Sequence, residues 1–282
     1  MVFLFFVSLL WAFSFGLIKG QLTSLDPFFV AFARLLLSFL VFLPFFRWQA
    51  FKRQKVLLLV GGLQFGLMYM FYIYSYQWLM AYQVALFTIF TPIYITLLDD
   101  FLQKRFHWIH FSAAVLSVIG TGIIFWKQFD QANFLKGFVL VQASNFCFAT
   151  GQILYRKYRR ERSSIRSEAQ LFAALYLGGA LITGLGSAWS VNWSSLVLMK
   201  TQILTLMYLG IIASGIGFFL WNYGALKVNA GTLAIFNNLK IPLAVLVAFL
   251  VFGESANLLR LSTGASLLGL ALWFNEKFAK TI

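Results

Sequence analysis

The stretch AGTLAIFNNLKIPLAVLVAFLVF, residues Ala230 to Phe252, is apolar almost throughout and carries one lysine, Lys240, near its centre. A helix of about 20 apolar residues crosses the roughly 30 Å of hydrocarbon in a bilayer, so the stretch predicts a transmembrane helix. An ammonium group near the bilayer midplane costs about 2.5–3.5 kcal/mol on insertion scales. Because a charge at that depth is so costly, Lys240 is the first candidate for a functional residue.

The composition extends this prediction to the whole chain. Of its 282 residues, 61% are hydrophobic and 11% are charged, whereas a soluble domain carries about 25% charged residues. We therefore expect an integral membrane protein with almost no soluble domain. The single cysteine, Cys147, excludes an internal disulfide. The first apolar run has neither a charged start nor a small-residue cleavage site, which favours a retained helix over a signal peptide.

Ten apolar runs are long enough to span a bilayer. They cover residues 2–18, 28–46, 56–79, 82–101, 107–126, 135–155, 169–189, 202–226, 230–252 and 258–275. With both termini placed in the cytoplasm, the inner segments hold fifteen lysines and arginines and the outer segments hold five. Because these residues are enriched in cytoplasmic loops, the bias predicts both termini inside. It also explains the net charge of +14 without nucleic acid as a partner. The densest basic cluster, Arg156 to Arg166, is interpreted as a solvated loop near anionic headgroups.

The two halves of the chain resemble each other. Residues Ala81–Pro92 (AYQVALFTIFTP) align with Gly231–Pro242 (GTLAIFNNLKIP), and Gly66–Tyr74 aligns with Gly215–Tyr223. Each half has five spans, an odd number, so the second half enters the membrane from the opposite side. Inverted repeats of this kind are common in secondary transporters. Chance similarity between apolar helices is the alternative.

The predicted fold is therefore an all-α membrane protein with ten transmembrane helices in two inverted five-helix repeats, residues 1–130 and 131–282. Pro92 and Pro242 fall at matching mid-span positions of the two repeats. A proline removes one backbone hydrogen bond and frees a carbonyl, so the pair predicts bent helices that shape a central pocket. Kinks that serve only helix packing are the alternative.

Five short motifs, in order along the chain, carry a resemblance to a known family. They are Trp11–Phe15 (WAFSF), Asp26–Leu35 (DPFFVAFARL), Trp221–Lys227 (WNYGALK), Pro242–Glu254 and Gly264–Gly269 (GASLLG). The whole chain resembles the drug/metabolite transporter superfamily, specifically its EamA type of ten-helix transporter. The resemblance implies a multi-pass carrier of the bacterial inner membrane, similar to exporters of amino acids, other metabolites or toxic compounds that work by alternating access.

Two features depart from the pattern of that family. Lys104 stands where a glutamate is usual, and Asp99 and Asp100 come shortly before it. Lys240 beside two asparagines is not a general feature of the family. We therefore expect a subgroup with a substrate of its own.

Lys240 is the leading candidate for binding a carboxylate or phosphate group of a solute. No carboxylate lies at a matching depth in another span, so an internal salt bridge is not expected. Asn237, three residues earlier, lies on the same helical face and can donate to a substrate oxygen. Asn238 points about 100° away and can equally bond a neighbouring helix. The alternative for Lys240 is a structural lysine held by carbonyls, amides and water.

Aromatic and polar side chains of other spans complete the candidate pocket. Tyr72 and Trp221 are expected to flank it, and Trp11 and Asn145 lie on polar stripes of the first and sixth spans. Such side chains also face lipid or hold helices together, which is the alternative for all four. Arg34, in the second span, is interpreted as structural.

Titratable residues at the membrane edge predict no further site. His107 and His110 lack a third metal ligand and are interpreted as interface residues, and Asp99 and Asp100 as solvated carboxylates. The sequence shows no nucleotide-binding loop, no nucleophile–base pair and no metal-ligand spacing. We therefore expect neither an enzyme nor a cofactor.

The sequence thus predicts a secondary transporter that moves a small anionic or zwitterionic metabolite, with an amino acid preferred. Coupling to protons or to a counter-solute is left open, as is the oligomeric state. The alternative carrier function is export of toxic hydrophobic or cationic compounds, which the positive centre disfavours. A membrane enzyme or scaffold is a remote alternative, because only His107, His110 and Asp99 are available for a catalytic set.

Overall fold

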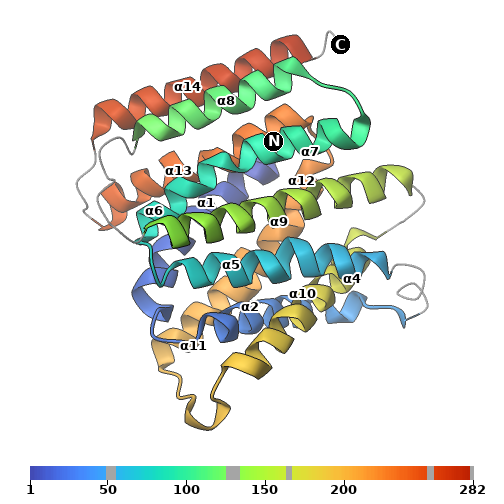
Figure 1. Ribbon diagram of the computed structural model, residues 1–282, viewed down its shortest axis with the longest axis vertical. Helices are drawn as coiled ribbons and strands as arrows, with labels where there is room; N and C mark the ends of the chain where they lie inside the picture. The colour runs from blue at the N-terminus through green and yellow to red at the C-terminus, as the bar shows by residue number, and fades with distance from the viewer. Residues whose placement is uncertain (49–54, 125–133, 163–166, 253–256, 280–282) are drawn as a thin grey trace.

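The computed structural model describes most of the chain, in the ranges 1–48, 55–124, 134–162, 167–252 and 257–279. These ranges are helices joined by short connections, and they contain no β-strand (Figure 1). The boundary expected between residues 130 and 131 lies outside them, as does Glu254 of the fourth motif.

Ten helical segments of the described ranges correspond to the ten predicted spans. In the first half they are α1 (Val2–Leu17) continued by η1 (Ile18–Leu22); α2 (Pro27–Phe42) continued by η2 (Leu43–Phe45); the run of α4 (Val56–Gly61), η3 (Gly62–Leu67) and α5 (Met68–Ser75); the run of α6 (Ala81–Phe87), η4 (Thr88–Phe90) and α7 (Thr91–Gln103); and α8 (Trp108–Ile124). In the second half they are α9 (Phe134–Glu161); α10 (Glu168–Ser190), followed by the short turn η5 (Trp193–Ser195); the run of α11 (Lys200–Met207), η6 (Tyr208–Ile216) and α12 (Gly217–Ala225); α13 (Ala230–Phe252); and α14 (Leu258–Phe278). Eight segments are long and apolar enough to cross a membrane, and α8 is a shorter apolar helix.

The start of α2 shows how local sequence sets a helix boundary. The side chain of Asp26 accepts hydrogen bonds from the backbone N–H groups of Phe28 (2.8 Å) and Phe29 (3.1 Å). Pro27 occupies the first helical position, where its missing N–H leaves no bond unmade. The cap and the proline together fix the point at which the second span begins.

The helices pack in a pattern that recurs when the two halves are exchanged. α8 lies along α14, and α2 lies along α10 (Figure 1). α1 packs against α12 and α13, and its counterpart α9 packs against α5 and α7. The π-helical segments η3 and η6 occupy matching places in the third and eighth spans. The prediction of ten transmembrane helices in two inverted repeats is confirmed.

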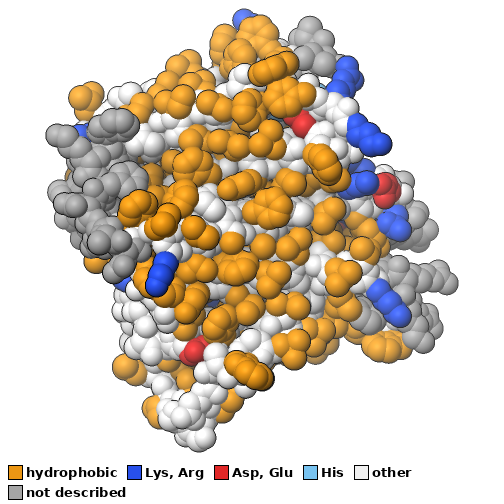
Figure 2. Space-filling view, viewed as in Figure 1, with side chains coloured by type: hydrophobic (Ala, Val, Ile, Leu, Met, Phe, Trp, Pro, Cys, Tyr) orange, Lys and Arg blue, Asp and Glu red, His pale blue; other side chains and the backbone are white. Residues whose placement is uncertain are grey.

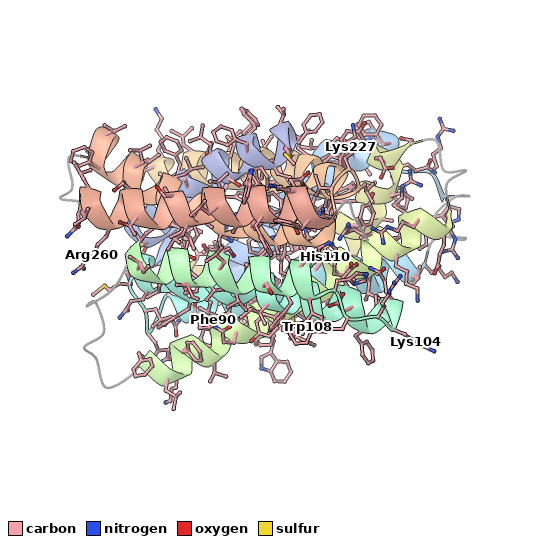
Figure 3. The ribbon with its side chains drawn as sticks, turned by 90° about the horizontal axis from the view of Figure 1, so that it is seen from above. Phe90, Lys104, Trp108, His110, Lys227 and Arg260 are labelled. Carbon is pink, nitrogen blue, oxygen red and sulfur yellow. The ribbon has the colours of Figure 1, made fainter. Side chains whose placement is uncertain are left out.

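Basic side chains gather at one end of the helices. Figure 2 shows lysine and arginine mainly along one edge of a largely apolar surface. In Figure 3, Lys104 and Lys227 lie toward one end of the molecule and Arg260 lies toward the other. The first two belong to segments expected in the cytoplasm and Arg260 to one expected outside, so their placement agrees with the charge rule. The orientation of the termini stays a prediction.

The fourth and ninth spans differ where the sequence suggested symmetry. In the fourth span, the 3₁₀ turn η4 separates α6 from α7, and Pro92 follows at the second position of α7. In the ninth span, α13 runs as one α-helix through Pro242. The helix is therefore interrupted on one side of the pseudo-symmetric pair and continuous on the other.

Two glycines allow α4 and α10 to meet backbone to backbone. A Cβ atom on Gly61 would lie 1.9 Å from the carbonyl oxygen of Leu175, and one on Gly178 would lie 2.1 Å from the carbonyl oxygen of Leu58. Neither position has room for a side chain unless a backbone moves. Small residues are the usual means of such close packing between membrane helices.

We expect Gly178→Ala to lower the midpoint of thermal unfolding in detergent by several degrees, because the added methyl group must push α10 away from α4. Gly122→Ala in α8 is the matched control, since nothing lies within 4 Å of its added Cβ. Fluorescence-monitored unfolding of the two purified variants measures the difference. Equal midpoints for the two variants would contradict the close packing of α4 and α10.

Candidate binding cavity

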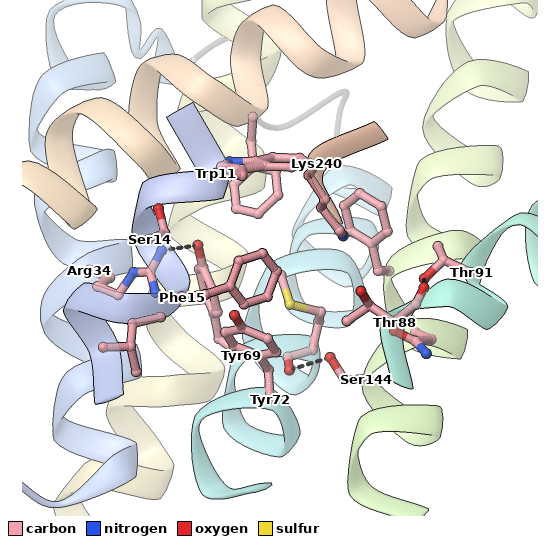
Figure 4. Close-up of a pocket in the computed structure, with 15 residues that line it drawn as sticks. Trp11, Ser14, Phe15, Arg34, Tyr69, Tyr72, Thr88, Thr91, Ser144 and Lys240 are labelled. Carbon is pink, nitrogen blue, oxygen red and sulfur yellow. Dashed lines mark hydrogen bonds between the residues drawn. The ribbon is translucent and has the colours of Figure 1, made fainter. Parts of the chain in front are cut away.

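Helices of both repeats line a cavity (Figure 4). Six aromatic residues line it, namely Trp11, Phe15, Tyr69, Tyr72, Phe148 and Phe218. The other lining residues are Ser14, Ile18, Arg34, Met68, Thr88, Thr91, Ser144, Asn145 and Lys240. Among these described residues there are two positive side chains and no carboxylate.

The ammonium of Lys240 enters the cavity from α13. Its Nζ atom lies 5.7 Å from the centre of the Trp11 ring, over the ring face. Within the described part of the chain, the ammonium has no ion pair and no hydrogen bond to another side chain or carbonyl. A cation–π contact replaces only a small part of the hydration of an ammonium. The three N–H donors of Lys240 are therefore available to a molecule in the cavity.

The Trp11 ring is held in place by the second repeat. Its Nε1 donates to the carbonyl oxygen of Ala213 in η6 at 2.9 Å. Its ring centre lies 4.8 Å from that of Trp221 and 5.0 Å from that of Phe218. Trp221 is fully buried behind Trp11 and does not line the cavity, contrary to the expectation that it flanks the pocket directly. It supports the ring that does.

Arg34 lines the same cavity from α2, although the sequence favoured a structural role. The side chain is 2% exposed. Its Nη2 donates to the Tyr69 hydroxyl at 2.6 Å and its Nε donates to the Ser214 hydroxyl at 3.2 Å, and the two hydroxyls lie 2.8 Å apart. Arg34, like Lys240, is a cation in an apolar span without a carboxylate at its depth. That signal was sufficient to place Arg34 in the site.

Asparagine side chains from two other spans hold the interruption in the fourth span. The amide of Asn145 donates to the carbonyl oxygen of Phe87 at 2.9 Å, and that of Gln142 donates to the same oxygen at 3.0 Å. The amide of Asn238 donates to the carbonyl oxygen of Ile89 at 3.1 Å. These amides tie the 3₁₀ turn beside the cavity to α9 and α13.

The predicted site residues therefore fall into two groups. Lys240, Trp11, Tyr72 and Asn145 line the cavity, whereas Asn237, Asn238, Trp221, Pro92 and Pro242 do not. The Asn237 amide donates to the carbonyl oxygen of Leu233 one turn back in its own helix, at 2.9 Å, and is fully buried. Pro242 lines a separate apolar groove between α13 and α14. Lys240, which the sequence singled out for the cost of a mid-span charge, lines the cavity, whereas the amide of Asn237, expected on the same helical face, bonds its own backbone.

Charged residues at the end of the molecule expected in the cytoplasm form a buried network, which corrects their interpretation as solvated groups. Arg156 lies inside α9 rather than in a loop and is 1% exposed. It donates to the carbonyl oxygen of Val228 at 2.8 Å, and its Nη1 lies 3.9 Å from a carboxylate oxygen of Asp99. The neighbouring Asp100 accepts from the backbone N–H of His107 at 3.1 Å. The contacts of Arg156 tie α9 to α7 and to the connection between α12 and α13. In the described residues, no group of three histidine, cysteine or acidic side chains is arranged to hold a metal ion.

Two inverted five-helix repeats around a central cavity are the architecture of many secondary transporters. The chain belongs to the EamA-like transporter family, whose sequence model matches residues 1–126 and 135–275. It is therefore a multi-pass membrane protein that transports a small molecule.

Relatives from three bacteria match this chain in sequence over nearly their whole length. A protein of Pseudomonas aeruginosa named "Probable biotin transporter" is 39% identical over 98% of this chain and 97% of its own. Proteins named "Biotin transporter" from Salmonella typhimurium and Escherichia coli are 38% and 37% identical, each over 99% of this chain and 93% of the relative. A solved crystal structure matches 99% of this chain and 98% of its own with a TM-score of 0.76. Its 18% sequence identity makes it a match of fold alone.

We expect Asn238→Leu to destabilise the protein by about 1–2 kcal/mol, because it removes the donor to Ile89 and also the contacts to Ser117 (3.3 Å) and Thr121 (3.1 Å). Asn237→Leu is the matched control, since its amide bonds only its own helix. Unfolding in detergent compares the two variants. A loss for Asn237→Leu as large as that for Asn238→Leu would argue against a specific bond to the interrupted span.

Proposed function

We propose that this chain carries biotin across the bacterial inner membrane by alternating access, and that Lys240 binds the biotin carboxylate. The carrying observation is the ammonium of Lys240, which faces an aromatic cavity and has no ion pair among the described residues. The names of the relatives from three bacteria point to the same substrate.

The chemistry of biotin matches the two properties of the cavity. Biotin has a carboxylate at the end of a hydrocarbon chain and a compact bicyclic body at the other end. The carboxylate can form charge-assisted hydrogen bonds with the ammonium of Lys240, which are stronger than bonds between neutral groups. The body and chain can contact aromatic rings such as Trp11, Phe15 and Tyr72. Binding therefore pairs a charge that the protein alone leaves in an apolar environment.

The same cavity argues against an amino acid, the preference drawn from the sequence. An amino acid carries an ammonium as well as a carboxylate, and a buried ammonium needs a negative partner. The described lining residues include no aspartate or glutamate to supply one. Repulsion from Lys240 and Arg34 disfavours cationic drugs for the same reason. An anion with an apolar body can pair with the cations and contact the aromatic rings of the cavity.

Removing the charge at Lys240 should weaken biotin binding without lowering the stability of the protein. We expect Lys240→Met to weaken biotin binding at least tenfold, since a hydrogen bond to a charged group contributes about 1.5–3 kcal/mol. We expect its thermal midpoint to stay equal or rise, because an unpaired charge leaves the membrane interior. Isothermal titration of the purified variant with biotin, with unfolding measured in parallel, gives both quantities.

Lys227→Met is the matched control for this experiment. Lys227 lies at the end of α12, with its Nζ 4.1 Å from the centre of the Tyr223 ring, and does not line the cavity. Its substitution removes the same charge from the chain and should leave biotin affinity within twofold. Wild-type affinity in Lys240→Met would overturn the proposed role of Lys240.

A further inference from the structure

The cavity contains a second cation whose charge the protein leaves uncompensated. Arg34 is 2% exposed, and no aspartate or glutamate of the described chain forms an ion pair with it. Its nearest polar partners are two neutral hydroxyls, those of Tyr69 and Ser214. A guanidinium kept so deep without a counter-charge is costly. The cost indicates a role beyond joining α2 to its neighbours.

The guanidinium is fixed in orientation and has one free end. Nε and Nη2 are both engaged, and the Ser214 hydroxyl that accepts from Nε is itself anchored to the carbonyl oxygen of Leu209 at 2.6 Å. The guanidinium carbon lies 4.2 Å from the centre of the Tyr69 ring. Nη1 is buried and has no partner among the described residues. Arg34 thus keeps the unpartnered Nη1 in a fixed orientation at the cavity wall.

Arg34 and Lys240 reach the cavity from different sides. α2 packs against α10 and η6, whereas α13 packs against α1, α7 and α8. Figure 4 shows the two side chains on different walls, with Arg34 beside Tyr69 and Lys240 beside Trp11. A ligand that satisfies both cations must therefore carry acceptors at two separated positions.

The chemistry of the two donors decides which end each one binds. A carboxylate binds best to a group with several free N–H donors, which Lys240 has, or to the paired fork of a guanidinium. Two of the five N–H donors of Arg34 are already bonded to hydroxyls, whereas no donor of Lys240 has a partner among the described residues, so we assign the carboxylate to Lys240. The unpartnered Nη1 of Arg34 can donate to one carbonyl oxygen. In biotin, the carbonyl of the cyclic urea lies at the opposite end from the carboxylate.

We propose that Arg34 is a specificity-determining residue that donates through Nη1 to a neutral carbonyl oxygen at the far end of the substrate, the urea carbonyl of biotin. This assignment rests on the proposed function. Tyr69 and Ser214 are positioning residues that hold the guanidinium in the required orientation. The site then selects a molecule by two acceptors at its opposite ends, one charged and one neutral.

Lipoate is a comparison ligand that tests the carboxylate end of biotin without its carbonyl end. It carries the same pentanoate chain as biotin, but its ring is a disulfide without a carbonyl. Titration of wild-type protein, Arg34→Gln and Lys240→Met with biotin and with lipoate gives six affinities. We expect Arg34→Gln to weaken biotin about tenfold or more and lipoate less than twofold. We expect Lys240→Met to weaken both ligands about equally.

The outcomes distinguish this inference from the proposed function. If wild-type protein binds biotin but Arg34→Gln weakens biotin and lipoate alike, or weakens neither, the role of Arg34 is overturned and biotin transport stands. If wild-type protein does not bind biotin, both proposals fail. Tyr69→Phe keeps the charge and loses the bond that orients Nη2, so it should also lower biotin affinity selectively. Retained lipoate affinity shows that a variant is folded, and Tyr69→Phe replaces Arg34→Gln if that variant does not fold.

Discussion

A positive charge that has no negative partner inside an apolar protein constrains most of this structure. Lys240 lies in a helix of the ninth span, faces a cavity with aromatic walls and has no ion pair in the described chain. In such surroundings the energy of an ion pair is much larger than in water, and so is the cost of leaving a charge alone. The feature that makes the lysine costly therefore makes an entering anion favourable. Arg34, on another wall of the cavity, adds a second unpaired cation that favours an entering anion.

The shape of the cavity depends on a local departure from regular helix. The 3₁₀ turn at Thr88–Phe90 interrupts the fourth span, and the carbonyls near it accept from Asn145, Gln142 and Asn238. These donors come from α9 and α13, so the interruption in the first repeat is held by the second. At one end of the molecule, Arg156 joins α9 to Asp99 and to Val228.

The sequence predicted the number of spans, the inverted repeat and the place of Lys240, because all three follow from apolar length and from where charges lie. It could not predict which of two adjacent asparagines bonds another helix, since Asn237 and Asn238 differ only in rotation about α13 and in what α7 and α8 bring near them. The interpretations of Arg156 and Asp99 as solvated were wrong, because they were based on position near a span end and ignored the contact between α7 and α9. The preference for an amino acid rested on family resemblance, whereas the relatives are named as biotin transporters.

The most direct test of the account is the distance between the biotin carboxylate and Nζ of Lys240 in a structure of the complex. We predict a carboxylate oxygen at about 2.7–2.9 Å from Nζ, the range of charge-assisted hydrogen bonds. The rings of Trp11 and Tyr72 should then flank the ligand. A complex in which the carboxylate instead binds Arg34, or in which biotin lies outside this cavity, would contradict the central role of Lys240.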